Sequence, residues 1–348
     1  MTTSHDPQAR PAEHPTWTMP QLMQLATGYW ASAALGAAVE LGLFPALDTG
    51  AEAGRTAEQI AAEIGSASAR HTAALLDSLA GLSLVAKTDQ RYRIAPGAAR
   101  LLSPSSPDCI IDALRFNTAM YQLWGQLPDC VRNGAPVVPP QAHLGEDEAR
   151  TRGFVMGMYG RARGLAPAVV AAIDLEDIER LLDLGSGPGL YSLLLARKYP
   201  QLKVTQLDLP GVVKVARELQ ENEPEFDRIS FIPADYRQAD LPGGHEAVLF
   251  CGAIHQESPE SAAIVLEKVR AALPPGGRVI IVDMMVNGEG TQPAFSALFG
   301  LNMMLVNPQA HMFSEPQLKK LLEETGFDDP SCRAIAESPY WLIEATRR

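Results

Sequence analysis

The sequence is poor in cysteine: among 348 residues there are four, Cys109, Cys130, Cys251 and Cys332, and no two of them form a CxxC pair. The simplest account of such widely spaced cysteines is free thiols in a reducing compartment. We therefore predict a cytoplasmic protein.

Long apolar runs and excess positive charge are also missing. No apolar run reaches the roughly 18 residues that a membrane-spanning helix needs. Residues 1–16 contain three prolines and no apolar signal core, so we expect a disordered tail and no secretion. Lys and Arg number 29 against 41 Asp and Glu, and this net charge of -12 argues against nucleic acid or an anionic membrane as the main partner.

What the chain does have is enough apolar residues, 46%, to bury a sizeable core, and at this length two domains are expected. The most informative stretch is an apolar run, 180–184, followed by Gly185, Gly187 and Gly189 and then by an amphipathic run, 191–199. This order is typical of a buried strand, a tight glycine turn and a helix. Glycines there allow a positive φ and let a ligand approach main-chain N–H groups.

A second apolar run, 203–207, ends in Asp208, nineteen residues after Gly189. An acidic side chain at that distance can accept hydrogen bonds from both hydroxyls of a ribose. A plain turn between strand and helix would explain the glycines alone, but it would not explain the acid. The combination favours a nucleoside-containing cofactor.

Beyond residue 178, strands and helices alternate regularly. We expect strands at 180–184, 203–207, 229–232, 246–251 and 278–283, and helices at 190–199, 211–222 and 259–272. A helix at 313–326 and two antiparallel strands, 332–336 and 340–344, would close the sheet. This pattern predicts a mostly parallel sheet with helices on both faces over residues 173–348.

The region 17–105 has a different character. Residues 19–47 show small and large apolar residues at helical spacing, which predicts a helix packed closely against another, in a second subunit. A helix from Thr56 to Ile64, another from Ser68 and a hairpin, 85–87 with 91–94, then follow the winged-helix pattern. Residues 51–100 contain six Lys or Arg against five Asp or Glu, too balanced a charge for a DNA-binding face. We interpret the region as a dimerisation module.

Residues 106–172 are expected to form a helical connector, interrupted by a loop at Pro136, Pro139 and Pro140. The connector is rich in aromatic residues and methionine. These side chains are typical of a core, but they also suit the lining of a pocket for an irregular or aromatic ligand.

The order of these parts resembles the S-adenosylmethionine-dependent small-molecule O-methyltransferases of the plant caffeate type and their bacterial natural-product relatives, from about residue 20 to 345. The resemblance is carried by five segments: Leu182 to Gly189, Leu207 to Pro210, Ala234 to Tyr236, Ile254 with His255, and Leu273 to Arg278. It implies a Rossmann-like class I methyltransferase domain with a seven-stranded sheet, preceded by a winged-helix dimerisation domain.

The resemblance also implies roles for individual residues. The cofactor, with S-adenosylhomocysteine as its product, would contact Asp183, Gly185, Gly187, Gly189, Asp208, Leu209, Asp235, Tyr236 and Cys251. Within this set Asp208 would hold the ribose and Asp235 the adenine amino group. His255 would be the catalytic base and Asp283 would orient it, since a neutral imidazole suits deprotonation of a phenol. The acceptor pocket would be formed by Phe116, Met120, Trp124, Phe154, Met158, Phe299, Asn302, Met303 and Asn307.

The sequence departs from the family pattern at several positions. A second acidic residue that orients the histidine falls at Met312, and the residue after the histidine, usually Asp, is Gln256. A lysine near the cofactor is replaced by Cys251, and a serine that contacts the cofactor is replaced by Ala162. The cofactor site is therefore better supported than the base.

These departures leave two alternatives open. In the first, His255, His311 and Glu257 bind a metal ion that assists C-methylation of a 2-oxo acid, with Arg115, Arg161 or Arg163 holding the substrate carboxylate. In the second, the fold keeps the cofactor but has lost methyl transfer. We favour O-methylation of a hydroxyl on a small molecule in secondary metabolism, by a homodimer without a metal.

Overall fold

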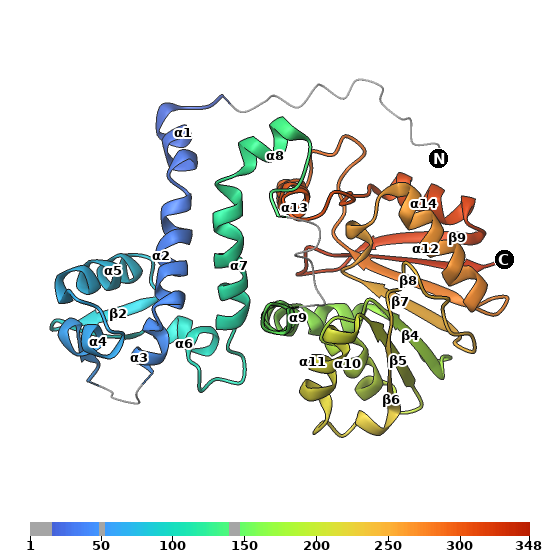
Figure 1. Cartoon of the computed structure of the whole chain (residues 1–348), viewed down its shortest axis with the longest axis horizontal. Coiled ribbons are helices and arrows are strands. Elements are labelled where there is room, and N and C mark those ends of the chain that lie inside the picture. Colours follow the sequence, from blue (N-terminus) through green and yellow to red (C-terminus); the bar gives the residue numbers. More distant parts are fainter. Residues whose placement is uncertain (1–15, 49–52, 139–146) are drawn as a thin grey trace, which may run out of the picture.

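Figure 1 shows the computed structural model of the chain, which describes residues 16–48, 53–138 and 147–348. The helical N-terminal region lies on the left of that view and the large α/β region on the right, with helices α7 and α9 between them. The tail predicted to be disordered falls, except for Thr16, outside the described residues.

The apolar run 19–47 forms three helices rather than one: α1 (Met19–Ala26), α2 (Tyr29–Glu40) and α3 (Leu43–Leu47). The second break follows from Gly42, which has a φ of 70° and so cannot continue a right-handed helix. The helical character predicted for this run is thus confirmed, but it is divided among three helices. Much of that apolar surface is exposed, including 61% of Trp30.

The next segment folds around a small sheet. Its elements are β1 (Arg55–Thr56), α4 (Ala57–Glu63), α5 (Ala69–Gly81), β2 (Val85–Thr88), β3 (Arg91–Ile94) and α6 (Pro96–Leu102). Thr56 and Ser68 cap α4 and α5 by accepting from the backbone N–H groups of Gln59 and His71. The hairpin is confirmed, and β1 joins it in the order β1-β3-β2. The winged-helix name for this segment stays a prediction.

The connector consists of α7 (Ile111–Trp124), α8 (Leu127–Asn133) and α9 (Glu148–Ala172). Helices α7 and α9 pack closely because α9 has a glycine at the crossing. A Cβ at Gly157 would lie 2.7 Å from the Cβ of Phe116. Pro136 follows α8, as expected, whereas Pro139 and Pro140 lie outside the described residues.

The large sheet has the strand order β6-β5-β4-β7-β8-β10-β9. Its strands are β4 (Arg180–Leu184), β5 (Lys203–Asp208), β6 (Ile229–Pro233), β7 (Ala247–Cys251), β8 (Arg278–Asp283), β9 (Phe327–Ala334) and β10 (Trp341–Arg347). The first five in spatial order are parallel, and β10 pairs antiparallel with both β8 and β9. The seven-stranded, mostly parallel sheet is thus confirmed.

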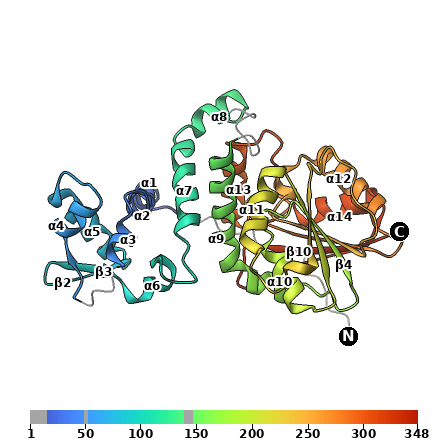
Figure 2. The ribbon, with the colours of Figure 1, turned by 60° about the horizontal axis from the view of Figure 1, so that its bottom comes forward.

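Helices cover both faces of this sheet: α10 (Leu190–Lys198), α11 (Pro210–Gln220), α12 (Pro259–Ala272) and α14 (Glu315–Glu324) join α9. Successive side chains of a strand point to opposite faces. Leu181 accordingly packs in the core with α9 and α10, and Leu182 in the core with α12 and α14. Figure 2 shows these two pairs of helices on opposite sides of the strands.

Three elements differ from the predictions for the C-terminal part, and one of them is β10, which ends at Arg347 and not at Glu344. Strand β9 begins at Phe327, five residues before the predicted start, and directly follows α14. The segment 294–304 forms an additional helix, α13, for which no prediction was made. The strand order itself places the crevice: the connection after β4 runs towards β5 and the connection after β7 runs towards β8, so these two connections diverge and leave a gap at the carboxyl ends of β4 and β7.

Candidate active site

The glycine loop connects the buried strand β4 to α10. Gly185, Gly187 and Gly189 have φ values of 66°, 56° and 72°, the left-handed region in which other residues are strained. A Cβ at Gly187 would meet no atom within 4 Å. The Ser186 hydroxyl is buried and has no hydrogen-bond partner. The loop thus offers open space and an unsatisfied polar atom to a ligand.

A buried pair of amide side chains supports the loop from behind. The Gln206 Nε2 donates to the carbonyl of Gly189 (3.1 Å) and to the Ser192 hydroxyl (3.0 Å). The Gln220 Nε2 donates to the carbonyl of Pro188 (3.0 Å) and to the Gln206 Oε1 (2.9 Å). Both glutamines are almost completely buried. A Cβ at Gly189 would lie 2.3 Å from atoms of each, so only glycine fits there.

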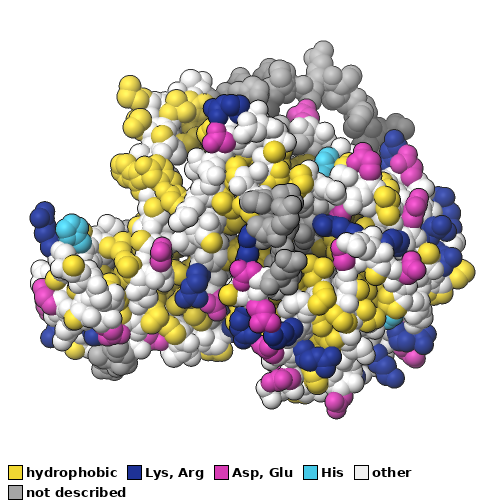
Figure 3. Space-filling model, in the orientation of Figure 1, with side chains coloured by type: hydrophobic (Ala, Val, Ile, Leu, Met, Phe, Trp, Pro, Cys, Tyr) yellow, Lys and Arg dark blue, Asp and Glu magenta, His cyan; other side chains and the backbone are white. Residues whose placement is uncertain are grey.

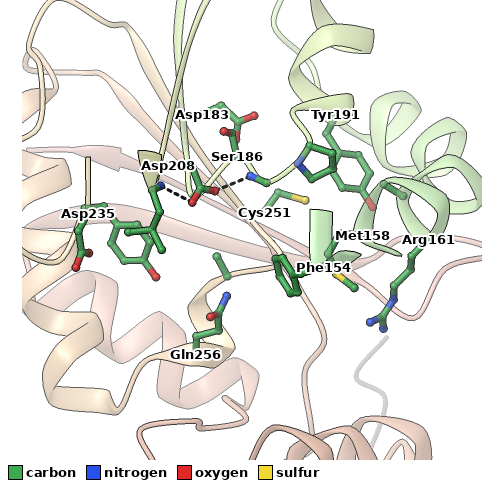
Figure 4. A pocket seen from close by; sticks show the side chains of 18 of the residues that line it. Phe154, Met158, Arg161, Asp183, Ser186, Tyr191, Asp208, Asp235, Cys251 and Gln256 are labelled. Carbon is green, nitrogen blue, oxygen red and sulfur yellow. Dashed lines mark hydrogen bonds between the residues drawn. The ribbon is translucent and has the colours of Figure 1, made fainter. Parts of the chain in front are cut away.

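In front of the loop lies a cavity of about 320 Å³ at the carboxyl ends of β4, β5, β6 and β7. Figure 4 shows it with the acidic residues on one side and residues of α9 on the other. Its lining comprises the glycine loop, Asp183, Tyr191, Asp208, Leu209, Ala234 to Arg237, Cys251 to Ala253, Gln256, Tyr340, and Phe154, Met158, Arg161 and Ala162 of α9. Of the residues predicted to bind the cofactor, all but Gly189, the N-cap of α10, line this cavity.

Asp208 ends β5 and is held by two backbone donors. Its Oδ2 accepts from the Gly187 N–H and its Oδ1 from the Leu209 N–H, both at 2.7 Å. Burial raises the pKa of Asp208 to about 6, and the two donated hydrogen bonds oppose that shift. Burial likewise raises the pKa of Asp183 to about 7. A carboxylate has about four acceptor positions, so Asp208 can still accept from two hydroxyl groups.

The loop after β6 contributes Asp235 and Tyr236. The Asp235 carboxylate accepts from the Arg237 N–H (2.9 Å) and the Gln238 side chain (3.0 Å), which fix its position at the rim of the cavity. The Tyr236 ring packs edge-on against Phe250, with 5.5 Å between ring centroids. A flat aromatic surface and a fixed carboxylate therefore stand side by side.

His255 lies in a short 3-10 turn (Ile254–Gln256) after β7 and is 7% exposed. Its Nδ1 is 2.9 and 3.0 Å from the two carboxylate oxygens of Asp283, which ends β8 and is 1% exposed. Asp283 also accepts from the backbone N–H groups of His255 and Met284. With Nδ1–H donating to the carboxylate, the Nε2 atom is left as the acceptor. His255 does not itself line the cavity, but Ala253 and Gln256 on either side of it do.

Five of the nine residues predicted to form the acceptor pocket either line the cavity or contact a residue beside it. Phe154 and Met158 line the cavity, and Phe116 stacks edge-on against Phe154. Phe299 packs edge-on against the His255 ring at 4.9 Å, and Asn307 donates to the carbonyl of Gln256 at 2.8 Å.

The remaining members of the predicted set lie further out. The Trp124 ring N–H donates to Asn302 at 2.9 Å and so connects α7 to α13. Met120 and Met303 lie on these same two helices, half-buried, and neither lines the cavity.

The metal alternative does not fit the contacts of Glu257. This carboxylate is fully buried and accepts from Arg237 Nε and the Tyr236 hydroxyl, both at 2.7 Å, and from the Ser261 hydroxyl. The His311 N–H donates to the His255 carbonyl at 3.0 Å, and the His311 ring packs against Phe313. Within residues 16–48, 53–138 and 147–348, no three His, Cys, Asp or Glu side chains are placed to hold a metal ion. The predicted ligand set is therefore not assembled.

The departures from the family pattern are visible in the structure. Cys251 and Ala162 both line the cavity, and burial raises the pKa of the Cys251 thiol well above its usual value. Met312 packs against Gly300 of α13, where a Cβ would be 2.8 Å from its Cγ.

Sequence reasoning missed Tyr191, Tyr340 and the Gln206–Gln220 pair. Only Tyr191 had a usable signal, its position in the first turn of the helix after the glycine loop.

Comparison with known proteins assigns the chain to a family. Residues 124–328 match an O-methyltransferase domain and residues 23–104 an O-methyltransferase dimerisation domain. A 3-hydroxy-5-methyl-1-naphthoate 3-O-methyltransferase from Streptomyces sahachiroi is 33% identical over 290 residues, 82% of each chain.

Two solved structures share the fold. One is human N-acetylserotonin methyltransferase with S-adenosylmethionine (TM-score 0.86, 24% identity, 97% of this chain and 99% of the other). The second is PigF with S-adenosylhomocysteine (TM-score 0.85, 25% identity, 95% of this chain and 100% of the other). The chain belongs to the O-methyltransferase family, with its dimerisation domain, and is an S-adenosylmethionine-dependent methyltransferase.

Proposed function

We propose that this protein methylates a hydroxyl group on a small aromatic molecule, with His255 as the general base. The observation that carries the proposal is the buried His255–Asp283 pair, which lies at the carboxyl ends of two neighbouring parallel strands beside the cavity. A positioned imidazole with one free ring nitrogen is suited to removing a proton from a phenol near neutral pH.

The cavity fits the cofactor residue by residue. Asp208, Asp235, Tyr236 and Leu209 all line it. Asp208 would accept from the ribose hydroxyls and Asp235 from the adenine amino group, with Tyr236 and Leu209 against the ring. The Ser186 hydroxyl and the glycine-loop backbone face the amino-acid part. When bound, the cofactor supplies an activated methyl group on its sulfonium. The protein is then required to align the acceptor and to remove one proton.

Asp283 supports His255 as a base in two ways. Its carboxylate holds the Nδ1–H and thereby fixes the tautomer and the direction of the ring, and Phe299 packs against the ring from another side. The negative charge of Asp283 stabilises the imidazolium that forms when Nε2 accepts the hydroxyl proton. Loss of this proton would leave the acceptor oxygen as the nucleophile that takes the methyl group.

The side chains around the cavity support an aromatic acceptor. Phe154, Met158 and Phe299 provide flat and adaptable apolar surfaces, and the naphthoate-methylating relative from Streptomyces sahachiroi acts, by its name, on an aromatic hydroxyl. The C-methylating metal alternative is not favoured, because Glu257 is paired with Arg237. The four cysteines are free thiols, and the cytoplasmic location inferred from them stays a prediction.

Replacement of the base tests the proposal. Wild type, His255→Gln and His311→Gln would be incubated with S-adenosylmethionine and a panel of hydroxynaphthoates, phenols and 2-oxo acids, with and without EDTA. Glutamine can still donate to Asp283 but cannot take up a proton, so we expect a fall in kcat of about 10²- to 10⁴-fold. His311→Gln is the matched control and should stay within a few-fold of wild type, since its Nε2 has no partner.

Binding of S-adenosylhomocysteine, measured by calorimetry, should be similar in all three proteins. A fully active His255→Gln enzyme would remove this residue as the base. Activity that disappears with EDTA and with His311→Gln would instead restore the metal alternative.

A further inference from the structure

The cavity is lined by three carboxylates but by only two cationic side chains. Asp183, Asp208 and Asp235 contribute the negative charges, and Arg161 and Arg237 the positive ones. Arg237 is already paired, because its Nε donates to the fully buried Glu257 at 2.7 Å. An anionic ligand that enters this acidic cavity therefore needs Arg161 as its counter-charge.

Arg161 is held in place without an ion pair. It lies on α9, and among the described residues no carboxylate is within salt-bridge distance of its guanidinium. Its Cζ lies 5.4 Å from the centre of the Phe299 ring, the ring that also packs against His255. Stacking on an aromatic face orients the planar guanidinium but leaves its N–H donors free. Arg161 is thus both fixed and unsatisfied.

Two tyrosines complete the surroundings of Arg161. Tyr191 begins α10 directly after the glycine loop, and Tyr340 precedes β10; both line the cavity. Burial raises the pKa of Tyr340 to about 12 and that of Tyr191 further, and Arg161 opposes both shifts. Arg161 thus acts on two neutral hydroxyl groups that also hydrogen-bond to each other, so one O–H of the pair remains to donate to a ligand.

Figure 4 shows Arg161 and Tyr191 on the opposite side of the cavity from Asp235. We propose that Arg161, Tyr191 and Tyr340 form a carboxylate-binding site at this end of the cavity. The proposal rests on the proposed function, since it names the chemistry of the ligands used there. The carboxylate belongs either to the amino-acid part of the cofactor or to the acceptor, and both present the same planar anion to a guanidinium.

The first experiment measures binding without turnover. Calorimetric Kd values for S-adenosylhomocysteine and for 5′-methylthioadenosine, which lacks the amino-acid part, would be compared in wild type, Arg161→Met and Arg163→Met. Methionine keeps the apolar stem of the side chain on Phe299. Arg163 is the matched control because it lies two residues further along α9, does not line the cavity, and is 3.9 Å from Asp108.

If the cofactor supplies the carboxylate, Arg161→Met should weaken S-adenosylhomocysteine binding about 10- to 100-fold, the loss expected for charge-assisted hydrogen bonds. Its affinity for methylthioadenosine should stay at the wild-type value, which also shows that the cavity is still folded. Arg163→Met should bind both compounds like wild type. Tyr340→Phe should show a smaller loss, confined to S-adenosylhomocysteine.

The second experiment tests the acceptor as the source. If S-adenosylhomocysteine binds equally to wild type and Arg161→Met, the KM for a hydroxynaphthoate should rise at least tenfold in the variant. The KM for the matching naphthol, which lacks the carboxylate, should not change. Equal Kd values in the first experiment and equal KM values in the second would overturn the carboxylate site.

The two experiments separate failure of this site from failure of the proposed function. A wild-type protein that binds S-adenosylhomocysteine but methylates no hydroxyl compound contradicts the proposed function, while the loss of binding in Arg161→Met still supports the carboxylate site. Normal methylation by Arg161→Met, with unchanged Kd and KM values, contradicts only the site.

Discussion

At the scale of single residues, the protonation of Asp208 couples cofactor binding to pH. Its folded pKa of about 6 lies above the model-compound value of 3.8, so the free protein holds this proton more tightly than the unfolded chain does. Hydroxyl groups that donate to the carboxylate favour its ionised form. Cofactor binding should therefore release the proton, and affinity should rise with pH up to and through about 6 and then level off.

Calorimetry with S-adenosylhomocysteine between pH 5 and pH 8 measures this effect. Asp208→Asn should bind more weakly at pH 8 and should lack the rise near pH 6, because an amide does not titrate in this range. An affinity that is constant across the range in wild type would contradict the role of Asp208.

Some residue roles could be predicted from sequence because strand ends meet at one edge of the sheet. Asp208 and Asp235 follow neighbouring parallel strands, and the register pairs Asp208 with Pro233. Glu257 shows the limit of such reasoning. From the sequence its carboxylate could have been a metal ligand. In the structure it accepts a hydrogen bond from Arg237, which lies twenty residues earlier in the chain. Nothing in the spacing of those two residues indicates an ion pair.

At the scale of elements, the shape of the glycine loop depends on the buried pair Gln206 and Gln220. We expect Gly189→Ala to lower the melting temperature well beyond the loss from a positive φ alone, since the new Cβ would lie 2.3 Å from both glutamines. Gly65→Ala is the matched control: its φ is 68°, close to the 72° of Gly189, but a Cβ there meets nothing within 4 Å.

Thermal unfolding and S-adenosylhomocysteine binding would be measured for both variants. Gly65→Ala should lose only the strain of about 1–2 kcal/mol and keep its affinity. Gly189→Ala should lose more stability and also affinity, because the carbonyls of Pro188 and Gly189 cannot both keep their amide donors. Equal effects of the two substitutions would show that the glutamines do not define the loop.

The elements that sequence predicted well are those with strong local signals. Buried parallel strands are short apolar runs bounded by turns, and β4, β5, β6 and β8 begin and end within one residue of their predicted limits. The apolar run 19–47 is divided at Thr27 and Gly28 and again at Gly42, which adopts a left-handed conformation, and apolar spacing alone does not locate such breaks. The start of strand β9 was missed because Asp328 and Asp329 are poor strand formers, although Asp328 pairs with Thr346 of β10.

At the scale of the whole molecule, Trp17 and helices α1 and α2 expose an apolar surface that the described residues of one chain leave uncovered. Its members are Trp17, Met19, Leu22, Met23, Leu25, Tyr29 and Trp30, each at least 50% exposed. Figure 3 shows hydrophobic side chains gathered over these helices at the upper left. The segment overlaps the dimerisation domain at residues 23–104, which supports a homodimer formed through this surface.

The double substitution Leu25→Glu and Trp30→Glu should convert the dimer to a monomer, because charges would be buried without partners at the interface. Light scattering after size exclusion measures the mass against 37.5 kDa for one chain. The control, Val131→Glu, changes an apolar residue of similar exposure on a different helix, α8, and should remain dimeric. A wild-type protein that elutes as a monomer would contradict the interface.

The placement of β10 has a consequence for how the enzyme is made. This strand is inserted between β8 and β9, and Tyr340 directly before it reaches the cavity. Until the ribosome has translated past residue 347, the α/β region lacks an inner strand of its sheet and one wall of its chamber. A nascent or prematurely terminated polypeptide should therefore be inert, so that the cell gains methyl-transfer capacity only from finished copies.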